Sequence, residues 1–234
     1  QMCIRDSPGD LMGRISTRTG QICSSESLFE ITVKGQGGHS AMPHVGRDSI
    51  LIGSEIVQAL QTIVARKLAP GSGAVVSVTE FLTDGQRNVL PSNVVLKGDV
   101  RARVLKERKA ISAFITQICE GIGGAHGAKI SVAFNTEFIE TINEAKPVIA
   151  AVKAAKSIGI EVTSDREPMS FSEDFAHFSA VVPGCFMLLG NGTDGPNGRP
   201  LHSADYDFND QLLPIGAAFW TQLVTERLPK AVSL

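Results

Sequence analysis

The sequence predicts an α/β fold, and two observations carry this prediction. Between residues 27 and 137, segments with a two-residue apolar period alternate with segments whose apolar residues recur at helical spacing. From Glu144 onward the sequence pattern is different and predicts an Ala-rich helix, a short apolar strand and a long Gly-rich loop. The 234 residues are 43% hydrophobic and 20% charged, which is ordinary for one or two globular domains.

The first half of the 27–137 region predicts a strand and then a helix. Residues 27 to 34 alternate between apolar and polar side chains, the pattern of a half-buried strand. A loop with three glycines in four residues follows, and a helical pattern begins near Asp48 and ends before Pro70-Gly71. The apolar stripe of this helix consists of Ile56, Leu60, Ile63 and Val64.

The second half of this region completes the pattern. Residues 74 to 82 are rich in β-branched side chains, and the turn signal Asp84-Gly85 separates them from another strand that runs through Val104. A helical stripe follows and is expected to end at Gly123-Gly124, after which residues 130 to 134 form the last strand. The resulting order, β-α-β-β-α-β, is the ferredoxin-like arrangement.

The remaining segments are also α/β in character. Residues 147 to 158 predict a helix with Pro147 in its first turn. Ser170 and Glu173 have capping-box spacing ahead of a short helix. A buried strand is expected at 185–189, a loop at 190–200 and a final helix at 211–228. Residues 1 to 12 show no periodicity, so no structure is assigned to them.

Composition excludes several classes of protein. The formal charge is −2 with no basic run, which argues against a nucleic-acid partner or an anionic membrane surface. No apolar run reaches the ~20 residues that a membrane span needs. The four cysteines are scattered and include no CxxC pair, which favours a reducing, cytoplasmic compartment over a disulfide scaffold.

Two of the five histidines stand in Gly-rich loops. His39 follows Gly35, Gly37 and Gly38, and His202 follows the loop at 190–200. Loops held between rigid elements commonly carry binding and catalytic groups, although a plain connection is an equally simple explanation of such a loop. No HExxH or paired-cysteine spacing gives local evidence of a metal site. His126 is explained by a helix end, and Asp174 with His177 by a solvated helix face.

Residues 29–44, FEITVKGQGGHSAMPH, resemble the lid-domain signature of the aminoacylase and carboxypeptidase G superfamily of metal-dependent amidohydrolases. Among its branches, the sequence is most similar to hippurate hydrolase and the indoleacetyl-amino-acid hydrolases. The resemblance covers about residues 13 to 230. Further motifs follow in the same order at residues 88–91, 98–101, 172–175, 183–184, 201–202 and 207–210.

The resemblance implies a domain organisation. Residues 27–137 would be a ferredoxin-like lid and dimerisation domain inserted into a catalytic α/β domain. Residues 1–26 would be a remnant of that catalytic domain and residues 138–234 its C-terminal part. The N-terminal half, which carries most metal ligands and the general base in the superfamily, would be missing, so the chain is expected to be a fragment that is inactive alone.

The resemblance also implies roles for individual residues. His202 matches a ligand of a two-metal site that holds zinc or manganese. His39 matches a histidine that crosses the dimer interface and stabilises the oxyanion in the partner's active site. Asn88 and Arg101 match lid positions that contact the substrate. His44 is expected to be structural.

We therefore expect hydrolysis of the amide bond of N-acyl amino acids by a homodimer joined through residues 27–137. A dipeptidase or aminopeptidase-like member of the same superfamily is the nearest enzymatic alternative. The non-enzymatic alternative is a ferredoxin-like dimerisation module, because that region is the only one whose set of elements is complete.

Overall fold

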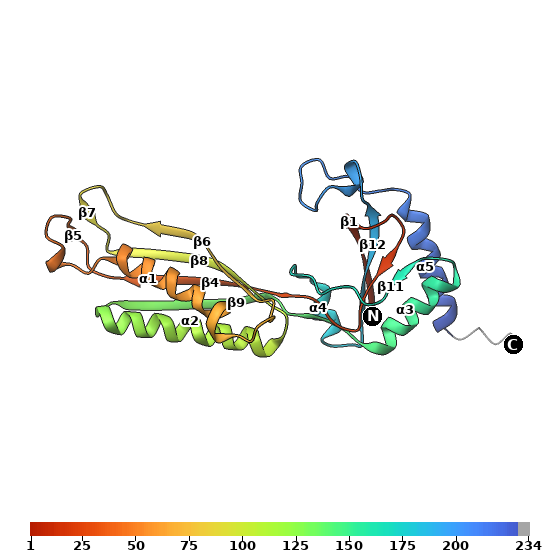
Figure 1. Ribbon diagram of the computed structural model, residues 1–234, viewed down its shortest axis with the longest axis horizontal. Coiled ribbons are helices and arrows are strands. Elements are labelled where there is room, and N and C mark those ends of the chain that lie inside the picture. Colours follow the sequence, from red (N-terminus) through yellow and green to blue (C-terminus); the bar gives the residue numbers. More distant parts are fainter. Residues whose placement is uncertain (229–234) are drawn as a thin grey trace. The chain divides into compact units, whose positions relative to one another are not determined.

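The computed structural model describes residues 1–228, and the chain forms two compact units (Figure 1). Unit 1 comprises Gln1–Ile22, Thr141–Met169 and the residues from Asp174 onward, and unit 2 comprises Cys23–Glu140 with Ser170–Glu173. The segment predicted at 138–234 therefore ends with six residues, 229–234, that lie outside the described range.

Unit 2 is a four-stranded antiparallel sheet with two helices. Its sheet has the order β6-β8-β4-β9, and every neighbouring pair is antiparallel. This confirms the predicted β-α-β-β-α-β order and mixed α/β class. The elements in chain order are β4 (Ser25–Lys34), α1 (Ser49–Thr62), β6 (Val75–Thr83), β8 (Asn93–Ala102), α2 (Leu105–His126) and β9 (Lys129–Phe138).

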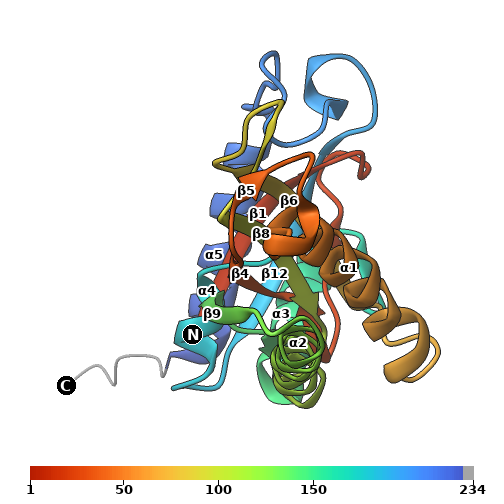
Figure 2. The ribbon, with the colours of Figure 1, turned by 90° about the vertical axis from the view of Figure 1, so that its left-hand side faces the viewer.

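The core of unit 2 lies between the sheet and both helices, which cover the same face (Figure 2). Strand β4 alternates, so that Phe29, Ile31 and Val33 are buried while the residues between them face away from the helices. The Phe29 ring occupies the space above Gly98, where an added Cβ would lie 2.2 Å from the ring. Only glycine leaves room for this packing.

The two helices of unit 2 have well-defined ends, one capped by a carboxylate and one terminated by a glycine. Helix α1 starts at Asp48, whose carboxylate accepts hydrogen bonds from the backbone N–H groups of Ile50 and Leu51. Helix α2 runs through Gly123-Gly124, so the predicted end there is wrong. Gly123 is buried within the helix, and the helix stops at Gly127, which takes the left-handed conformation with φ 60°.

Unit 1 is built on a short mixed sheet of order β1-β12-β2-β11. Strand β1 (Met2–Pro8) pairs in parallel with β12 (Cys185–Gly192). On its other side, β12 pairs antiparallel with β2 (Ile15–Ser16). Strand β2 in turn pairs in parallel with β11 (Val162–Thr163). Residues 2–8 thus form a strand where the sequence predicts no element. Their side chains are nearly all half-buried, so no apolar alternation marks them. A separate two-stranded sheet joins β3 (Gly20–Cys23) and β10 (Thr141–Asn143).

Among the described residues of unit 1, three α-helices flank its sheets: α3 (Ala145–Ser157), α4 (Phe175–Ser179) and α5 (Leu212–Arg227). Helices α3 and α5 share one apolar core with β12, which is buried along almost its whole length. The capping box predicted from Ser170 and Glu173 does not form, because α4 begins one residue later, with Asp174 as its N-cap and no side-chain capping bond. Within residues 1–228, no helix combines the length and the apolar content that a membrane span requires.

Candidate functional site

His39 and Asn88 lie together at one end of unit 2, although 48 residues separate them in the chain. His39 is on the short strand β5 (Gly38–His39), which pairs antiparallel with β7 (Val89–Leu90) so that His39 stands opposite Val89. The N–H of Ser40 donates to the carbonyl of Asn88 at 3.1 Å. Both side chains are exposed. The structure therefore places these two predicted site residues side by side.

Gly35 and Gly37, ahead of His39, allow a close approach of the backbone to its neighbours and do not adopt positive φ. An added Cβ at Gly35 would lie 2.3 Å from the carbonyl oxygen of Arg47, and one at Gly37 would lie 2.6 Å from the Ser92 hydroxyl. Backbone hydrogen bonds between Gln36 and Arg47 hold the loop against the start of α1. These contacts fix the position from which His39 projects.

The imidazole of His39 is oriented by its own loop. The backbone N–H of Ala41 donates to Nδ1 of His39 at 3.1 Å. A neutral ring that accepts at Nδ1 carries its proton on Nε2. His39 therefore presents an exposed N–H donor at the end of the unit.

Arg101 lies on β8 in a network that the sequence alone does not reveal. Its guanidinium donates from Nε to Asp99 at 2.7 Å, from Nη2 to Glu26 at 2.6 Å and from Nη1 to the Ser172 hydroxyl at 3.2 Å. Asp99 is two residues away on the same strand face, which the sequence could have suggested. Glu26 and Ser172 reach Arg101 only through strand register and tertiary contact, which no local pattern reports.

Arg101 is far from His39 within unit 2. It stands opposite Glu26 near the start of β4, whereas the loop of His39 follows Lys34 at the end of that strand. Eight residues of extended strand separate these points, which corresponds to about 26 Å. A small substrate cannot contact both side chains of one chain at the same time.

His202 is in the loop that joins β12 to α5 in unit 1. Its backbone has φ 69°, and it is the one non-glycine residue with positive φ among residues 1–228. Such conformations cost roughly 1–3 kcal/mol and persist where the surroundings impose them, commonly at functional sites. The ring is exposed and has no hydrogen-bond partner within the described residues, so both nitrogens are accessible.

The described residues do not gather a complete metal site. No group of three or more His, Cys, Asp or Glu side chains with metal-binding geometry occurs in residues 1–228. Asp205 is engaged in an ion pair with Arg199. Imidazole suits zinc or manganese as a ligand, so His202 fits such a site by its chemistry, as a single ligand.

The other histidines have simple surroundings. His44 is exposed in a short 3₁₀ turn, Pro43–Val45. His126 ends α2, and its Nε2 lies 2.7 Å from a carboxylate oxygen of Glu55 on α1. His177 is the third residue of α4, in unit 1.

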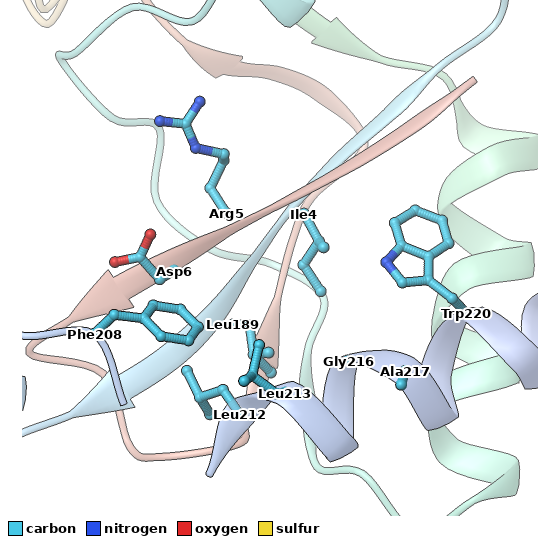
Figure 3. A pocket seen from close by; sticks show the side chains of 10 residues that line it. All are labelled: Ile4, Arg5, Asp6, Leu189, Phe208, Leu212, Leu213, Gly216, Ala217 and Trp220. Carbon is cyan, nitrogen blue, oxygen red and sulfur yellow. The ribbon is translucent and has the colours of Figure 1, made fainter. Parts of the chain in front are cut away.

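An apolar pocket of about 260 Å³ lies in unit 1 between β1, β12 and α5 (Figure 3). Figure 3 shows Phe208, Leu212 and Trp220 around it, with Arg5 and Asp6 as its charged side chains. Asp6 accepts a hydrogen bond from Tyr206, and burial together with this carboxylate raises the pKa of the Tyr206 hydroxyl. None of the four predicted site residues lines this pocket.

Residues 27–126 match the peptidase dimerisation domain of the M20 family. Over 213 residues the chain is 32% identical to the hippurate hydrolase of Campylobacter jejuni, covering 90% of this chain and 55% of that protein. Over 225 residues it is 30% identical to an indoleacetic acid (IAA)-amino acid hydrolase of Arabidopsis thaliana, covering 93% of this chain and 51% of that protein.

Solved structures share the fold. An aminohydrolase structure from methicillin-resistant Staphylococcus aureus superimposes with a TM-score of 0.85 at 26% identity, over 95% of this chain and 57% of that one. A dinuclear metal-binding peptidase of the M20 family from Bacillus subtilis gives a TM-score of 0.79 at 22% identity, over 96% and 56%. The chain therefore spans about half the length of the relatives it matches.

Proposed function

Because the chain belongs to the M20 family of metal-dependent amidohydrolases and peptidases, we propose that it forms part of an enzyme that hydrolyses the amide bond of N-acyl amino acids. Hippurate is an N-acylated glycine, and an IAA-amino acid conjugate is likewise an N-acyl amino acid. The names of these two relatives therefore support this substrate class over dipeptides.

The observation that carries the proposal is the exposed Nε2–H of His39, held in place by strand pairing and by the Ala41 hydrogen bond. Amide hydrolysis places negative charge on the carbonyl oxygen in the transition state. A fixed N–H donor aimed at that oxygen lowers the barrier, typically by about 3–4 kcal/mol. His39 would act as this donor, and the neighbouring Asn88 amide would contact the substrate.

His202 would hold one of two divalent ions, zinc or manganese. Bound metal supplies Lewis-acid polarisation of the amide carbonyl and lowers the pKa of a bound water. The strained backbone of His202 and its unengaged ring support the assignment. Since the described residues offer a single ligand, the remaining ligands would come from a segment outside this sequence. The proposal thus treats these 234 residues as part of a longer enzyme and as inactive alone.

Arg101 would bind the substrate carboxylate, because a guanidinium can donate two parallel hydrogen bonds to it. The bonds to Asp99, Glu26 and Ser172 use three of its five N–H groups, which fixes its orientation. Because about 26 Å of strand separates Arg101 from His39, the proposal assigns them to opposite protomers of one active site. Each site in the homodimer would combine His39 and Asn88 of one protomer with His202 of its partner.

The edge of unit 2 at β6 supports homodimerisation through residues 27–137. Within the described residues, β6 pairs with β8 on one side only, and its exposed side chains include the large apolar Phe81 and Leu82. The Phe81 ring packs over Gly53 of α1, next to the exposed Ile50 on the same helix face. The opposite edge, β9, exposes Lys129, Ser131, Asn135 and Glu137 instead, as protected edges do.

The cellular location in the proposal is the cytoplasm. Cys119 and Cys185 are buried thiols that form no disulfide. Free buried thiols are usual in proteins of reducing compartments.

The test is a substrate assay of the full-length enzyme with added zinc or manganese. N-benzoylglycine and N-acetyl amino acids should be hydrolysed, and unblocked dipeptides should not. Turnover of dipeptides alone would instead identify a dipeptidase of the same family. Absence of any turnover, together with a stable dimer, would favour a non-catalytic dimerisation module.

A further inference from the structure

One buried asparagine holds together the base of the loop that carries His202. We call this base, where Asn197 and Asp207 meet Asn191, the neck of the loop. Asn191 is the penultimate residue of β12, and its side chain is fully buried. Its Nδ2 donates to the carbonyl of Asn197 at 2.8 Å and to the carbonyl of Asp207 at 3.1 Å. His202 lies midway between those two residues, so a single amide group joins the two arms of the loop.

Both protons and the oxygen of this amide are engaged in hydrogen bonds. While Nδ2 gives both protons to the loop, Oδ1 of Asn191 accepts the backbone N–H of Asn209 at 2.8 Å. Nδ2 of Asn209 donates to the backbone carbonyl of Asn191 at 3.1 Å. Oδ1 of Asn209 accepts a hydrogen bond from the backbone N–H of Gln211, at the start of α5. The neck is therefore tied to β12 on one side and to α5 on the other.

A second amide reinforces the neck. Nδ2 of Asn197 donates to the same Asp207 carbonyl at 3.0 Å. Above the neck the Ser203 hydroxyl and N–H donate to the Pro200 carbonyl, and Arg199 pairs with Asp205. The Tyr206 hydroxyl in addition donates to Asp6 of β1. These contacts shape the turn at His202 but do not attach it to β12 or α5.

We propose that Asn191 is the positioning residue of His202. A ligand on an exposed, strained turn keeps its position only if the base of the loop is rigid, and here the rigidity comes from hydrogen bonds of a buried amide. Groups that orient a metal ligand commonly contribute 10- to 100-fold to metal affinity. This inference rests on the proposed role of His202 as a metal ligand.

The decisive variant is Asn191→Asp in the full-length protein. It keeps the shape of the side chain but turns an oxygen toward the two carbonyls that Nδ2 now serves, which breaks the neck. We expect the dissociation constant for zinc or manganese, measured by chelator competition, to rise about 10- to 100-fold. Asn197→Ala, which removes only the half-buried second amide, should give a smaller rise and serves if Asn191→Asp fails to fold.

Asn143→Asp is the matched control, because Asn143 is an equally buried amide of unit 1 that makes four hydrogen bonds away from this loop. It should lower the melting temperature without weakening metal binding by the folded protein. If it weakens metal binding as much as Asn191→Asp, the effect is general destabilisation and the inference fails.

His202→Ala separates this inference from the proposed function. Unchanged metal affinity in His202→Ala would show that His202 is not a ligand, and both proposals would fall. Weakened affinity in His202→Ala with unchanged affinity in Asn191→Asp and Asn197→Ala would overturn the positioning role alone.

Discussion

The internal structure of unit 1 and that of unit 2 are stabilised by different kinds of contact. In unit 2, β4 pairs with β8 over ten residues and with β9 over almost as many, above a continuous apolar core. In unit 1, β2 meets β11 and β12 over two residues each. The buried amide of Asn143 joins the segment after β2 to β12, and that of Asn191 joins β12 to the loop that follows it. Unit 2 relies on long backbone ladders throughout, whereas unit 1 combines one long ladder, between β1 and β12, with short ladders and a few buried amide side chains.

The same difference separates the two candidate functional histidines. His39 projects from a strand pair, and backbone contacts at Gly35 and Gly37 hold its loop. His202 sits on a strained turn whose base is fixed by asparagine side chains. We infer that the stability of unit 2 depends mainly on its buried apolar residues and changes little when its exposed polar residues are replaced. The stability of unit 1 also depends on individual buried polar residues.

The largest expected effect is on the core of unit 2. Ile31→Ala, at a fully buried position of the central strand β4, should lower the free energy of unfolding by about 2–5 kcal/mol. Denaturant titrations with thiol labelling should show earlier exposure of Cys119 in unit 2 and unchanged exposure of Cys185 in unit 1. Glu30→Ala, on the exposed face of the same strand, should change stability by less than about 0.5 kcal/mol. Equal early exposure of both thiols would mean that the units unfold as one.

The next effect is on catalysis. His39→Ala in the full-length enzyme should reduce kcat about 10²- to 10³-fold with little change in KM, because the donor acts mainly on the transition state. His44→Ala, an exposed histidine five residues further along, should leave kcat unchanged. Similar losses in both variants would point to a disturbed loop rather than to a missing donor.

A smaller effect is expected at a buried amide of unit 1. Asn143 donates from Nδ2 to the Phe186 carbonyl at 2.9 Å and accepts the Phe186 N–H at 2.7 Å. Asn143→Ala leaves the buried Phe186 N–H without this partner, while the carbonyl keeps the Thr17 hydroxyl, and it should lower stability by about 1–3 kcal/mol. Thiol labelling should report the loss at Cys185, with Cys119 unaffected. A loss below about 0.5 kcal/mol would contradict the role we assign to buried amides in unit 1.

The smallest effect is a pH dependence. Burial raises the pKa of the Cys119 thiol to about 12, with a further contribution from the charge of Glu120. The folded state keeps this proton while an unfolded thiol loses it near its ordinary pKa. Stability should therefore fall progressively as the pH rises from about 9 toward 12. In urea titrations at several pH values, the free energy of unfolding of Cys119→Ala should decrease less with rising pH than that of the wild type. An identical decrease in both proteins would contradict the assignment.

The sequence predicted unit 2 well because its structure follows local periodicity. The alternation of Phe29, Ile31 and Val33 identified β4, and the helical stripes identified α1 and α2 within a few residues. The end of α2 was missed because glycine weakens a helix without stopping it. Only the left-handed Gly127 ends it, and sequence does not distinguish the two cases.

Features that depend on distant residues could not be predicted. Strand β1 depends on pairing with β12, whose partner residues are about 180 positions away in the chain. Likewise, the Glu26 and Ser172 contacts of Arg101 and the asparagine neck below His202 join segments with no local signal. The four site residues came from resemblance to a known family, while the structure supplied their surroundings.

The central claim is that each active site takes His39 from one protomer and His202 from the other. Mixing two defective variants of the full-length enzyme, His39→Ala and His202→Ala, tests it directly. In a heterodimer, one site would lack both residues and the other would contain both. Random exchange of subunits makes half of the dimers heterodimers, so activity should recover to about one quarter of the wild-type value. Purified heterodimers that remain inactive would contradict the claim.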